Sequence, residues 1–224
     1  MPVGICNLCG FPVLRISGGY FGTRCLNCRS TRISRAAGQV VDSMKFSPEA
    51  IVYELSSRGA LFKFLRKKFR NLYFSEYYDD VAPGLMKRGV ICQDVQNLLL
   101  GDKIFDVVTS TEVFEHVPDD MKGFREIYRV LKTGGYFIFT VPLLENPKTV
   151  ERCFLQSDGS LVHKLDPEYH GDRIRGQGKV LAFRNYGLDI VERLNKCGFH
   201  AEIRVVNSML NVIKDNKVIL ARKT

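Results

Sequence analysis

Four of the seven cysteines occur as two C-x-x-C pairs that are separated by fifteen residues: Cys6, Cys9, Cys25 and Cys28. A C-x-x-C turn directs two thiolates at one ion, and two such turns complete the tetrahedral ligand set of a closed, structural zinc site. A module of this size has little core of its own, so the metal would supply much of its folding free energy. We expect structural zinc in residues 1–30; a redox pair or four unrelated free cysteines are the alternatives.

Carboxylates also follow three successive apolar runs that are typical of buried strands. Glu54 lies in IVYEL, Glu76 ends NLYFSE, and Asp94 ends GVICQD. In parallel sheets, ligands bind at the carboxyl ends of the strands. An acid at the second strand end can accept both hydroxyls of a ribose, and an acid at the third can accept from an amine such as adenine N6. Packing alone does not explain three such acids, so these positions are candidate binding residues.

A further polar cluster could carry acid–base chemistry. The run IFDVVTST ends at Thr111 and Glu112, and EVFEHVP adds Glu115 and His116. His116 is the candidate general base if an acceptor must lose a proton. Its alternative role is to cap or pack against the next helix. Glu112 and Glu115 could assist His116, or the three could bind a divalent ion.

Residues 163–172, HKLDPEYHGD, crowd five polar side chains into one segment: His163, Glu168, Tyr169, His170 and Asp172. Such a segment could bind a hydroxylated acceptor, with a Tyr or His as base, and a solvated loop is the alternative. Three nearby arginines could face an anionic acceptor: Arg173, Arg175 and Arg184.

The elements that must position these residues follow an alternating pattern. Helices are predicted over 30–44, 59–69, 119–132 and 187–197, and strands over IVYEL, NLYFSE, GVICQD, IFDVVTST, YFIFTVP, HAEIRVV and KVILARK. Between the cysteine pairs, FPVLRISGGYFGTR predicts a hairpin with its turn at Gly18-Gly19. A turn at Asp215-Asn216 would pair the last two strands. Residues 143–183 lack a regular pattern, which is typical of a functional loop or lid.

The predicted fold class is therefore α/β. We expect a Rossmann-like, doubly wound, mostly parallel seven-stranded sheet with an antiparallel C-terminal hairpin, preceded by a small N-terminal zinc knuckle or ribbon. The 224 residues suffice for one such domain plus the small module.

Composition excludes several other classes. The chain is 45% hydrophobic and 25% charged, as in soluble globular proteins, and no apolar run reaches the roughly 20 residues of a membrane span. The N-terminus lacks the basic start and apolar block of a signal peptide, so we expect a cytoplasmic protein. The net charge of +9 is compatible with a basic surface or with anionic partners. In KFLRKKFR, residues 63–70, helical spacing of the apolar residues predicts that the basic ones face solvent.

The segment FDVVTSTEVFEHVPDD…FREIYRVLKTGGYFIFTVP, within residues 105–142, resembles the central signature of class I S-adenosylmethionine-dependent methyltransferases. It is particularly similar to the branch that includes the ubiquinone and menaquinone biosynthesis enzymes. The resemblance begins near residue 50 and continues more weakly to the C-terminal hairpin. It implies a methyltransferase domain over 31–224, in which 143–186 form a substrate-side insertion.

The resemblance also implies roles for individual residues. Glu54 would lie near the amino end of S-adenosylmethionine, and Glu76 would hold the ribose hydroxyls. Asp94 would meet the adenine amine. Close to the sulfonium and the incoming substrate would lie Thr111 and Glu112. The remaining implied cofactor contacts are Ser56, Ser57 and Gly59 beneath the methionine part, Tyr77 beside the adenine, and Val95.

The turn after the first strand departs from the family pattern. The family has glycines where this chain has Ser56, Arg58 and Ala60. Glycine lets the backbone approach a pyrophosphate closely, but S-adenosylmethionine has no phosphate. Small side chains could therefore suffice, and Gly59 could still supply an unusual backbone conformation. We interpret the turn as altered but usable; a chain that kept the fold and lost the cofactor is the alternative.

The leading functional hypothesis is a methyltransferase for a small hydroxylated acceptor, such as a sugar or secondary metabolite, with a structural zinc module. One alternative is an RNA methyltransferase that grips its substrate through the zinc module and a basic surface. Another is a non-catalytic adaptor that retains the fold.

Overall fold

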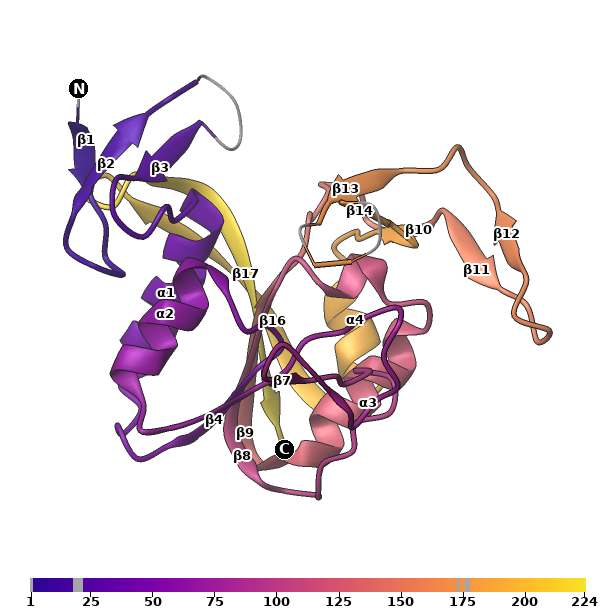
Figure 1. The fold of residues 1–224 in the computed structure, drawn as a ribbon. Coiled ribbons are helices and arrows are strands. Elements are labelled where there is room, and N and C mark those ends of the chain that lie inside the picture. Colours follow the sequence, from indigo (N-terminus) through magenta and orange to yellow (C-terminus); the bar gives the residue numbers. More distant parts are fainter. Residues whose placement is uncertain (1, 18–21, 173, 176–177) are drawn as a thin grey trace.

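The structure is a computed structural model that describes residues 2–17, 22–172, 174–175 and 178–224. The predicted turn at Gly18-Gly19 and the side chain of Arg173 lie outside the described residues. Figure 1 shows a central sheet with two helices on each face, a small N-terminal module above one face, and an insertion that projects from the other side. No helix among the described residues is both long enough and apolar enough to cross a membrane.

The central sheet contains six hydrogen-bonded strands in the order β16-β17-β9-β8-β4-β5. The four strands from β9 to β5 are mutually parallel, and β17 pairs antiparallel with both β9 and β16. The predicted α/β sheet with an antiparallel C-terminal hairpin is therefore confirmed. The strands span Ile51–Glu54 (β4), Asn71–Phe74 (β5), Phe105–Thr111 (β8), Leu131–Thr140 (β9), Phe199–Ser208 (β16) and Ile213–Lys223 (β17).

The prediction of a seventh sheet strand over GVICQD was wrong. This segment contributes only β7, Val90–Ile91, which forms a two-stranded ladder with β6, Met86–Lys87, and an isolated bridge from Cys92 to Glu76. The backbone of Cys92 instead hydrogen-bonds with Gly84 and Leu85 of the preceding connection. The connection between β5 and β7 is short and contains no helix, so it folds back beside Cys92. Gly84 and Leu85 therefore take the hydrogen-bonding positions that a neighbouring sheet strand would occupy.

The predicted helices all form. They are α1 (Arg32–Ser43), α2 (Gly59–Lys68), α3 (Asp120–Val130) and α4 (Ile190–Asn195). The Asp119 side chain caps α3 by accepting from the Lys122 backbone N–H. On α2, Leu61 and Leu65 are buried while the basic residues 63, 66 and 67 are exposed, so the basic run faces solvent as predicted.

Two apolar clusters cover the central sheet, one on each face, and a smaller third cluster fills the N-terminal module. Phe105, Phe124 and Leu194 belong to the cluster beneath α3 and α4. Val41 and Leu65 belong to the cluster beneath α1 and α2. Because both sheet faces are covered, the central strands are apolar on both sides and polar residues gather where the strands end.

The last two strands pair as predicted, but their turn is elsewhere. The turn occupies residues 209–212, and Asp215 and Asn216 lie within β17, where Asn216 is opposite Val206. The register shifts near this point, and Asp215 takes a positive φ of 47°. A positive φ suits Asp in a turn, and here it occurs at an irregularity inside the ladder.

The N-terminal module is a three-stranded antiparallel sheet formed by β1 (Pro2–Ile5), β2 (Pro12–Arg15) and β3 (Thr23–Cys25). Arg35 of α1 is fully buried beneath it. Its guanidinium donates to the Ser30 and Val212 carbonyls and to the Thr23 hydroxyl. One side chain thus joins the module, α1 and the β16–β17 turn.

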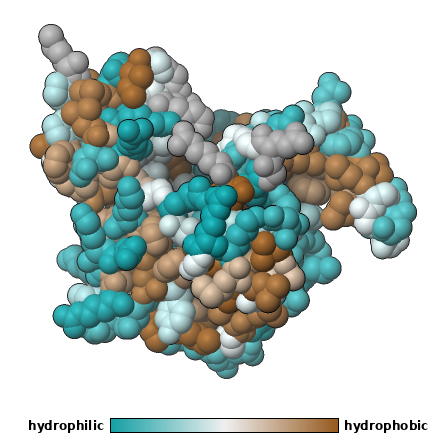
Figure 2. Space-filling model, in the orientation of Figure 1, coloured by the Kyte–Doolittle hydropathy of each residue, from teal (hydrophilic) through white to brown (hydrophobic). Residues whose placement is uncertain are grey.

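The insertion carries only short strands, namely β10 (Val150–Glu151), β11 (Cys153–Leu155), β12 (Leu161–His163), β13 (Tyr169–Gly171), β14 (Lys179–Leu181) and β15 (Arg184–Asn185). The β11–β12 hairpin projects as an arm, and Figure 2 shows apolar side chains along it. Arg184 anchors the base of the insertion. Its buried guanidinium donates to the backbone carbonyls of Phe114, Val117 and Pro118.

Candidate functional site

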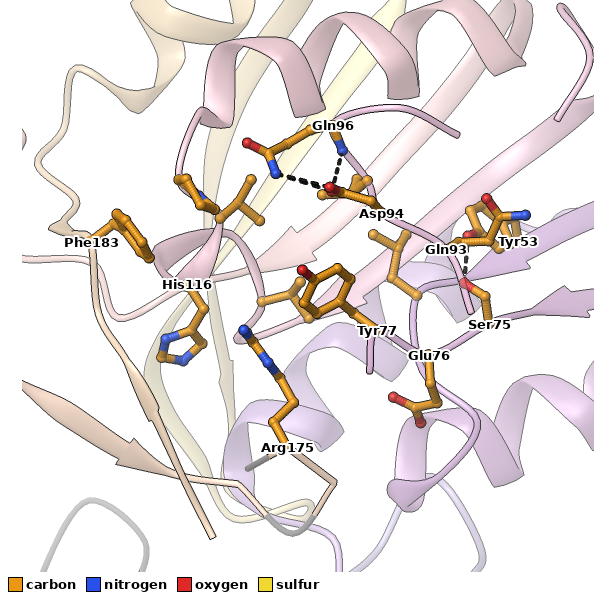
Figure 3. Close-up of a pocket in the computed structure, with 15 residues that line it drawn as sticks. Tyr53, Ser75, Glu76, Tyr77, Gln93, Asp94, Gln96, His116, Arg175 and Phe183 are labelled. Carbon is orange, nitrogen blue, oxygen red and sulfur yellow. Dashed lines mark hydrogen bonds between the residues drawn. The ribbon is translucent and has the colours of Figure 1, made fainter. Parts of the chain in front are cut away.

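A cavity opens at the carboxyl ends of β4 and β5, beneath the insertion. Its open volume is about 660 Å³. Figure 3 shows His116 and Glu76 at opposite ends of this cavity, with Tyr77 and Arg175 between them. The wall is formed by Tyr53, Leu55, Ser75, Glu76, Tyr77, Gln93, Asp94, Val95, Gln96, Val113, His116, Val117, Pro118, Arg175 and Phe183. Six residues that the sequence singled out therefore share one wall: Glu76, Tyr77, Asp94, Val95, His116 and Arg175.

Glu76 follows β5 and its carboxylate is held on one side only. Oε1 accepts from the Ser57 backbone N–H at 2.7 Å, from the Ser57 hydroxyl at 2.8 Å and from the Ser56 hydroxyl at 3.2 Å. No hydrogen bond among the described residues uses Oε2. Ser56, which stands where the family has a glycine, and its neighbour Ser57 thus fix the orientation of Glu76 and leave one carboxylate oxygen for a ligand.

Asp94 is oriented by a residue that the sequence analysis did not identify. The Gln96 backbone N–H and side-chain amide both donate to Asp94 Oδ1, at 2.9 and 3.1 Å. The Gln96 side-chain oxygen Oε1 in turn accepts from the Asp119 backbone N–H at the start of α3. The spacing of two residues from Asp94 is an Asx-turn signal that could have indicated Gln96.

Tyr77 and Arg175 narrow the middle of the cavity. The Arg175 guanidinium lies 4.8 Å from the centre of the Tyr77 ring and donates to Asp79 Oδ1 at 2.7 Å. The other wall residues contributed by the insertion include Phe183. Arg175 is one of the three arginines that the sequence offered as acceptor-facing, whereas no sequence signal would have placed Phe183 here, because it comes from the irregular segment.

Glu54 ends β4 but does not line the cavity. Its side chain is buried and accepts a short hydrogen bond from the Thr109 hydroxyl on β8. Burial raises the pKa of Glu54 to about 8, and the nearby Glu76 carboxylate adds to this shift. The Glu54 side chain therefore lies between β4 and β8, outside the cavity wall that Glu76 helps to form.

The turn from residue 56 to 59 separates the cavity from the cysteine module. Gly59 adopts a φ of 90°, a backbone conformation that side chains disfavour, as the sequence analysis anticipated. Ser57 and Gly59 face a separate surface depression that Cys9 and Cys28 also line. Ser56 and Ser57 reach the cavity indirectly, through Glu76.

Thr111 and Glu112 follow β8. The Thr111 hydroxyl and Glu112 Oε1 are buried and have no hydrogen-bond partner among the described residues. Glu112 has a φ of 54°, a left-handed conformation that is strained for a glutamate and that occurs often at functional sites. Burial, followed by the Glu115 carboxylate, raises the pKa of Glu112 to about 8.

His116 ends the short 3₁₀ helix η1 (Phe114–His116) and meets the insertion. Its Nδ1 donates to the Leu181 carbonyl at 2.8 Å, and burial lowers its pKa. The Glu115 carboxylate lies beside it, and the His170 ring packs against the His116 ring with 4.8 Å between centres.

The polar cluster at 163–172 is split by the structure. The His170 ring packs against His116 and its outer nitrogen pairs with Glu168, whereas His163 and Tyr169 are exposed. The Asp172 carboxylate instead accepts from the backbone N–H groups of the turn that follows it.

The four N-terminal cysteines converge. Their sulfur atoms all lie within 4.8 Å of one another, with 3.6 Å between Cys6 and Cys28 and 3.4 Å between Cys9 and Cys25. The Ser30 hydroxyl contacts the Cys6 sulfur at 3.1 Å. The two C-x-x-C turns thus form a single thiol cluster about one centre.

Comparison with known proteins adds family information. Residues 56–139 match a family model described as a methyltransferase domain. Sarcosine/dimethylglycine N-methyltransferase from Halorhodospira halochloris is 50% identical over 42 residues, which cover 19% of this chain and 15% of that protein. Ubiquinone biosynthesis O-methyltransferase from Pseudomonas putida is 48% identical over 44 residues, which cover 20% of this chain and 18% of that protein. The chain thus matches less than a fifth of the length of each of these curated relatives.

Solved structures extend the likeness over the whole fold. The glycopeptide N-methyltransferase MtfA, complexed with sinefungin, superposes with a TM-score of 0.56 at 16% identity, over 86% of this chain and 94% of that chain. At this identity the likeness shows the fold. The chain therefore has the fold of known S-adenosylmethionine-dependent methyltransferases, and its residues 56–139 match a methyltransferase domain.

Proposed function

We propose that the chain binds S-adenosylmethionine in the cavity between Glu76 and Asp94 and transfers its methyl group to a small hydroxylated acceptor. The observation that carries this proposal is the presence of two carboxylates, Glu76 after β5 and Asp94 after β7, on one wall of one cavity. Glu76 Oε2 supplies an acceptor for ribose hydroxyls, and Asp94 supplies one for the adenine amine. The Tyr77 ring provides an aromatic face beside the adenine.

Methyl transfer from a sulfonium is an in-line displacement. The acceptor oxygen forms a bond to the methyl carbon while the carbon–sulfur bond breaks, and sulfur keeps the electron pair. The protein mainly aligns the reacting atoms, an effect that can be worth roughly 7–11 kcal/mol. In our proposal Glu112 lies near the reacting centre, and His116 at the far end of the cavity from Glu76 is the group that meets the acceptor.

The acceptor side of the cavity is bounded by the insertion. Phe183 supplies an apolar surface, and Arg175 a positive charge that Asp79 partly balances. The curated relatives named above act on small molecules by their names, which supports an acceptor of that size. A cavity that combines apolar and aromatic wall residues with charged and polar groups at defined positions is typical of small-molecule sites.

We further propose that the thiol cluster binds a structural zinc ion. Zinc–sulfur bonds of about 2.3 Å in a tetrahedron separate sulfur atoms by roughly 3.8 Å. The sulfur separations of 3.4 and 3.6 Å, with all four within 4.8 Å, are compatible with such a site. Four thiolates leave no open position for a substrate, so the ion stabilises the module. Thiolate ligands also suit the cytoplasmic location that the sequence predicts.

The experiment is methyl transfer from labelled S-adenosylmethionine to a panel of phenols, sugars and amines, with RNA as a separate arm. Label on a small hydroxylated compound supports the proposal. Label on RNA, with binding that falls steeply as salt rises, would favour the nucleic-acid alternative instead. Absence of cofactor binding at millimolar concentration would favour the adaptor.

A further inference from the structure

We propose that Glu115, His116 and His170 form a binding site for a divalent transition-metal cation beside the cavity. The three ligand atoms lie within 4.8 Å of one another and come from two distant segments, η1 and β13. Two imidazole nitrogens and one carboxylate oxygen are a donor set that first-row divalent cations favour, and it leaves other coordination positions open.

The Glu115 carboxylate is the centre of the site. The residue is 1% exposed, and neither of its side-chain oxygens accepts a hydrogen bond among the described residues. Its backbone is fixed, because the Glu115 carbonyl accepts from the Phe183 N–H at 2.7 Å. A buried carboxylate without a partner is costly, and a cation is the partner that the surrounding donor set best accommodates.

His116 presents a lone pair to this carboxylate. Its Nδ1 is bonded to the Leu181 carbonyl, which can only accept, so Nδ1 carries the hydrogen. In the neutral ring Nε2 is then an acceptor, and it lies 3.5 Å from Glu115 Oε1. Two acceptors that face each other repel unless a cation lies between them.

His170 repeats this arrangement from the insertion. Its Nε2 lies 3.0 Å from the Glu168 carboxylate, which accepts its hydrogen. Nδ1 faces Glu115 Oε1 at 3.7 Å. Each imidazole thus gives its outer N–H to an oxygen and turns its other nitrogen toward Glu115. Metal-ligating histidines are almost always oriented by such an outer hydrogen bond.

The alternative to a bound metal ion is a proton on His170. Contact with Glu115, then with Glu168, raises the pKa of His170 to about 9, so a protonated His170 could balance Glu115 in place of a metal. His116 provides no second proton, because burial lowers its pKa. The metal and the proton predict different responses to added cation, which makes the two distinguishable.

The site would also serve the reaction, and this part of the inference rests on the proposed function. His116 lines the cavity, so a cation bound to it would be accessible to an acceptor held there. A coordinated hydroxyl loses its proton more readily, because the positive charge stabilises the oxyanion. The released proton would pass to solvent, and the oxyanion would attack the methyl carbon.

The probe is Mn²⁺, added to zinc-loaded protein so that the thiol cluster is already filled. Binding is measured from the loss of the free Mn²⁺ signal in electron paramagnetic resonance. Wild type is expected to bind one Mn²⁺ per chain with a dissociation constant below about 100 μM. Glu115→Gln and His170→Asn should each weaken binding at least about tenfold, because each removes a ligand.

Two further variants test whether Mn²⁺ binds at the proposed ligands. His163→Asn removes an exposed histidine of the same insertion and should bind Mn²⁺ like wild type. Glu168→Gln weakens the outer hydrogen bond of His170 and the ion pair with Arg152, at a side chain that is 37% exposed, and should weaken Mn²⁺ binding by roughly tenfold without risk to the core.

The metal site would be overturned if wild type failed to bind Mn²⁺, or if Glu115→Gln and His170→Asn bound Mn²⁺ as tightly as wild type. Either result would favour a protonated His170 as the partner of Glu115. S-adenosylhomocysteine binding is measured on the same samples without Mn²⁺. If it persists while Mn²⁺ fails to bind, only this inference is lost. If it is absent from wild type, the proposed function is lost as well.

Discussion

At the scale of single residues, three strand-end acids of similar sequence context have different environments. Glu54 is buried between β4 and β8 and bonded to Thr109. Glu76 and Asp94 line the cavity; Glu76 is anchored through Oε1 by Ser56 and Ser57, and Asp94 is anchored by Gln96, mainly through Oδ1. The same side-chain chemistry thus yields one acid with a raised pKa and two that are available to a ligand.

The raised pKa of Glu54 predicts a pH dependence of stability. Burial raises its pKa from 4.5 to about 8, so between these values the folded state holds a proton that the unfolded state has lost. Its contribution to stability is therefore complete below pH 4.5 and decreases as pH rises toward 8. Glu54→Gln should remove this decrease and, at pH 8, unfold at higher urea concentration, with a difference on the order of a few kcal/mol.

The measurement is urea unfolding of the ligand-free protein at pH 5 and pH 8. Glu49→Gln, an exposed acid on the same approach to β4, is the matched control and should follow wild type at both values. Parallel pH dependence in wild type and Glu54→Gln would contradict a buried, protonated Glu54.

At the scale of elements, the turn between β4 and α2 positions Glu76. Ser57 donates twice to Glu76 Oε1, through its N–H and its hydroxyl. In the proposed cofactor site, Ser57 would therefore act on a ribose through Glu76, as a positioning residue.

Ser57→Ala removes one hydrogen bond to the carboxylate and keeps the backbone one. S-adenosylhomocysteine affinity should fall about fivefold, in line with a net value near 1 kcal/mol for one such bond. In a Glu76→Gln background the same change should alter affinity less than about twofold, because the effect passes through Glu76. Calorimetric titration of the four proteins gives this cycle, and an equal loss in both backgrounds would mean that Ser57 touches the ligand directly.

The elements that the sequence predicts correctly are those set by local pattern. IFDVVTST and YFIFTVP are apolar runs that central strands require, and both lie in the sheet as β8 and β9. GVICQD has a similar pattern, but the hydrogen bonds of Cys92 to its own preceding connection remove it from the sheet. The sequence predicts Glu76 and Asp94 as site residues because each ends a short apolar run. The approach of His170 to Glu115 depends instead on how the irregular insertion folds back, and no local pattern encodes that.

At the scale of the whole molecule, the cysteine module is built into the domain. Besides the buried Arg35 network, the Ile5 backbone N–H donates to the Leu210 carbonyl in the β16–β17 turn. The hairpin that completes the central sheet therefore also supports the module. Loss of order in the module would expose Arg35 and weaken the packing of α1 on the sheet.

Metal removal should consequently destabilise the entire protein. Cys25→Ser, or a strong chelator, should lower the thermal unfolding midpoint of the whole chain by several degrees or more, because metal binding supplies folding free energy. Calorimetry and far-ultraviolet circular dichroism measure this, with Cys197→Ser as the control outside the cluster. A midpoint that the chelator leaves unchanged would show that the cluster holds no stabilising metal.

The most direct test of the central claim is calorimetric titration of zinc-loaded protein with S-adenosylhomocysteine, in wild type, Glu76→Gln and the exposed control Glu202→Gln. We predict one site per chain in wild type and in Glu202→Gln. Affinity should be about 10- to 100-fold weaker in Glu76→Gln, because hydrogen bonds to a charged acceptor are worth roughly 1.5–3 kcal/mol. No binding by wild type at millimolar ligand, or undiminished binding by Glu76→Gln, would contradict the account.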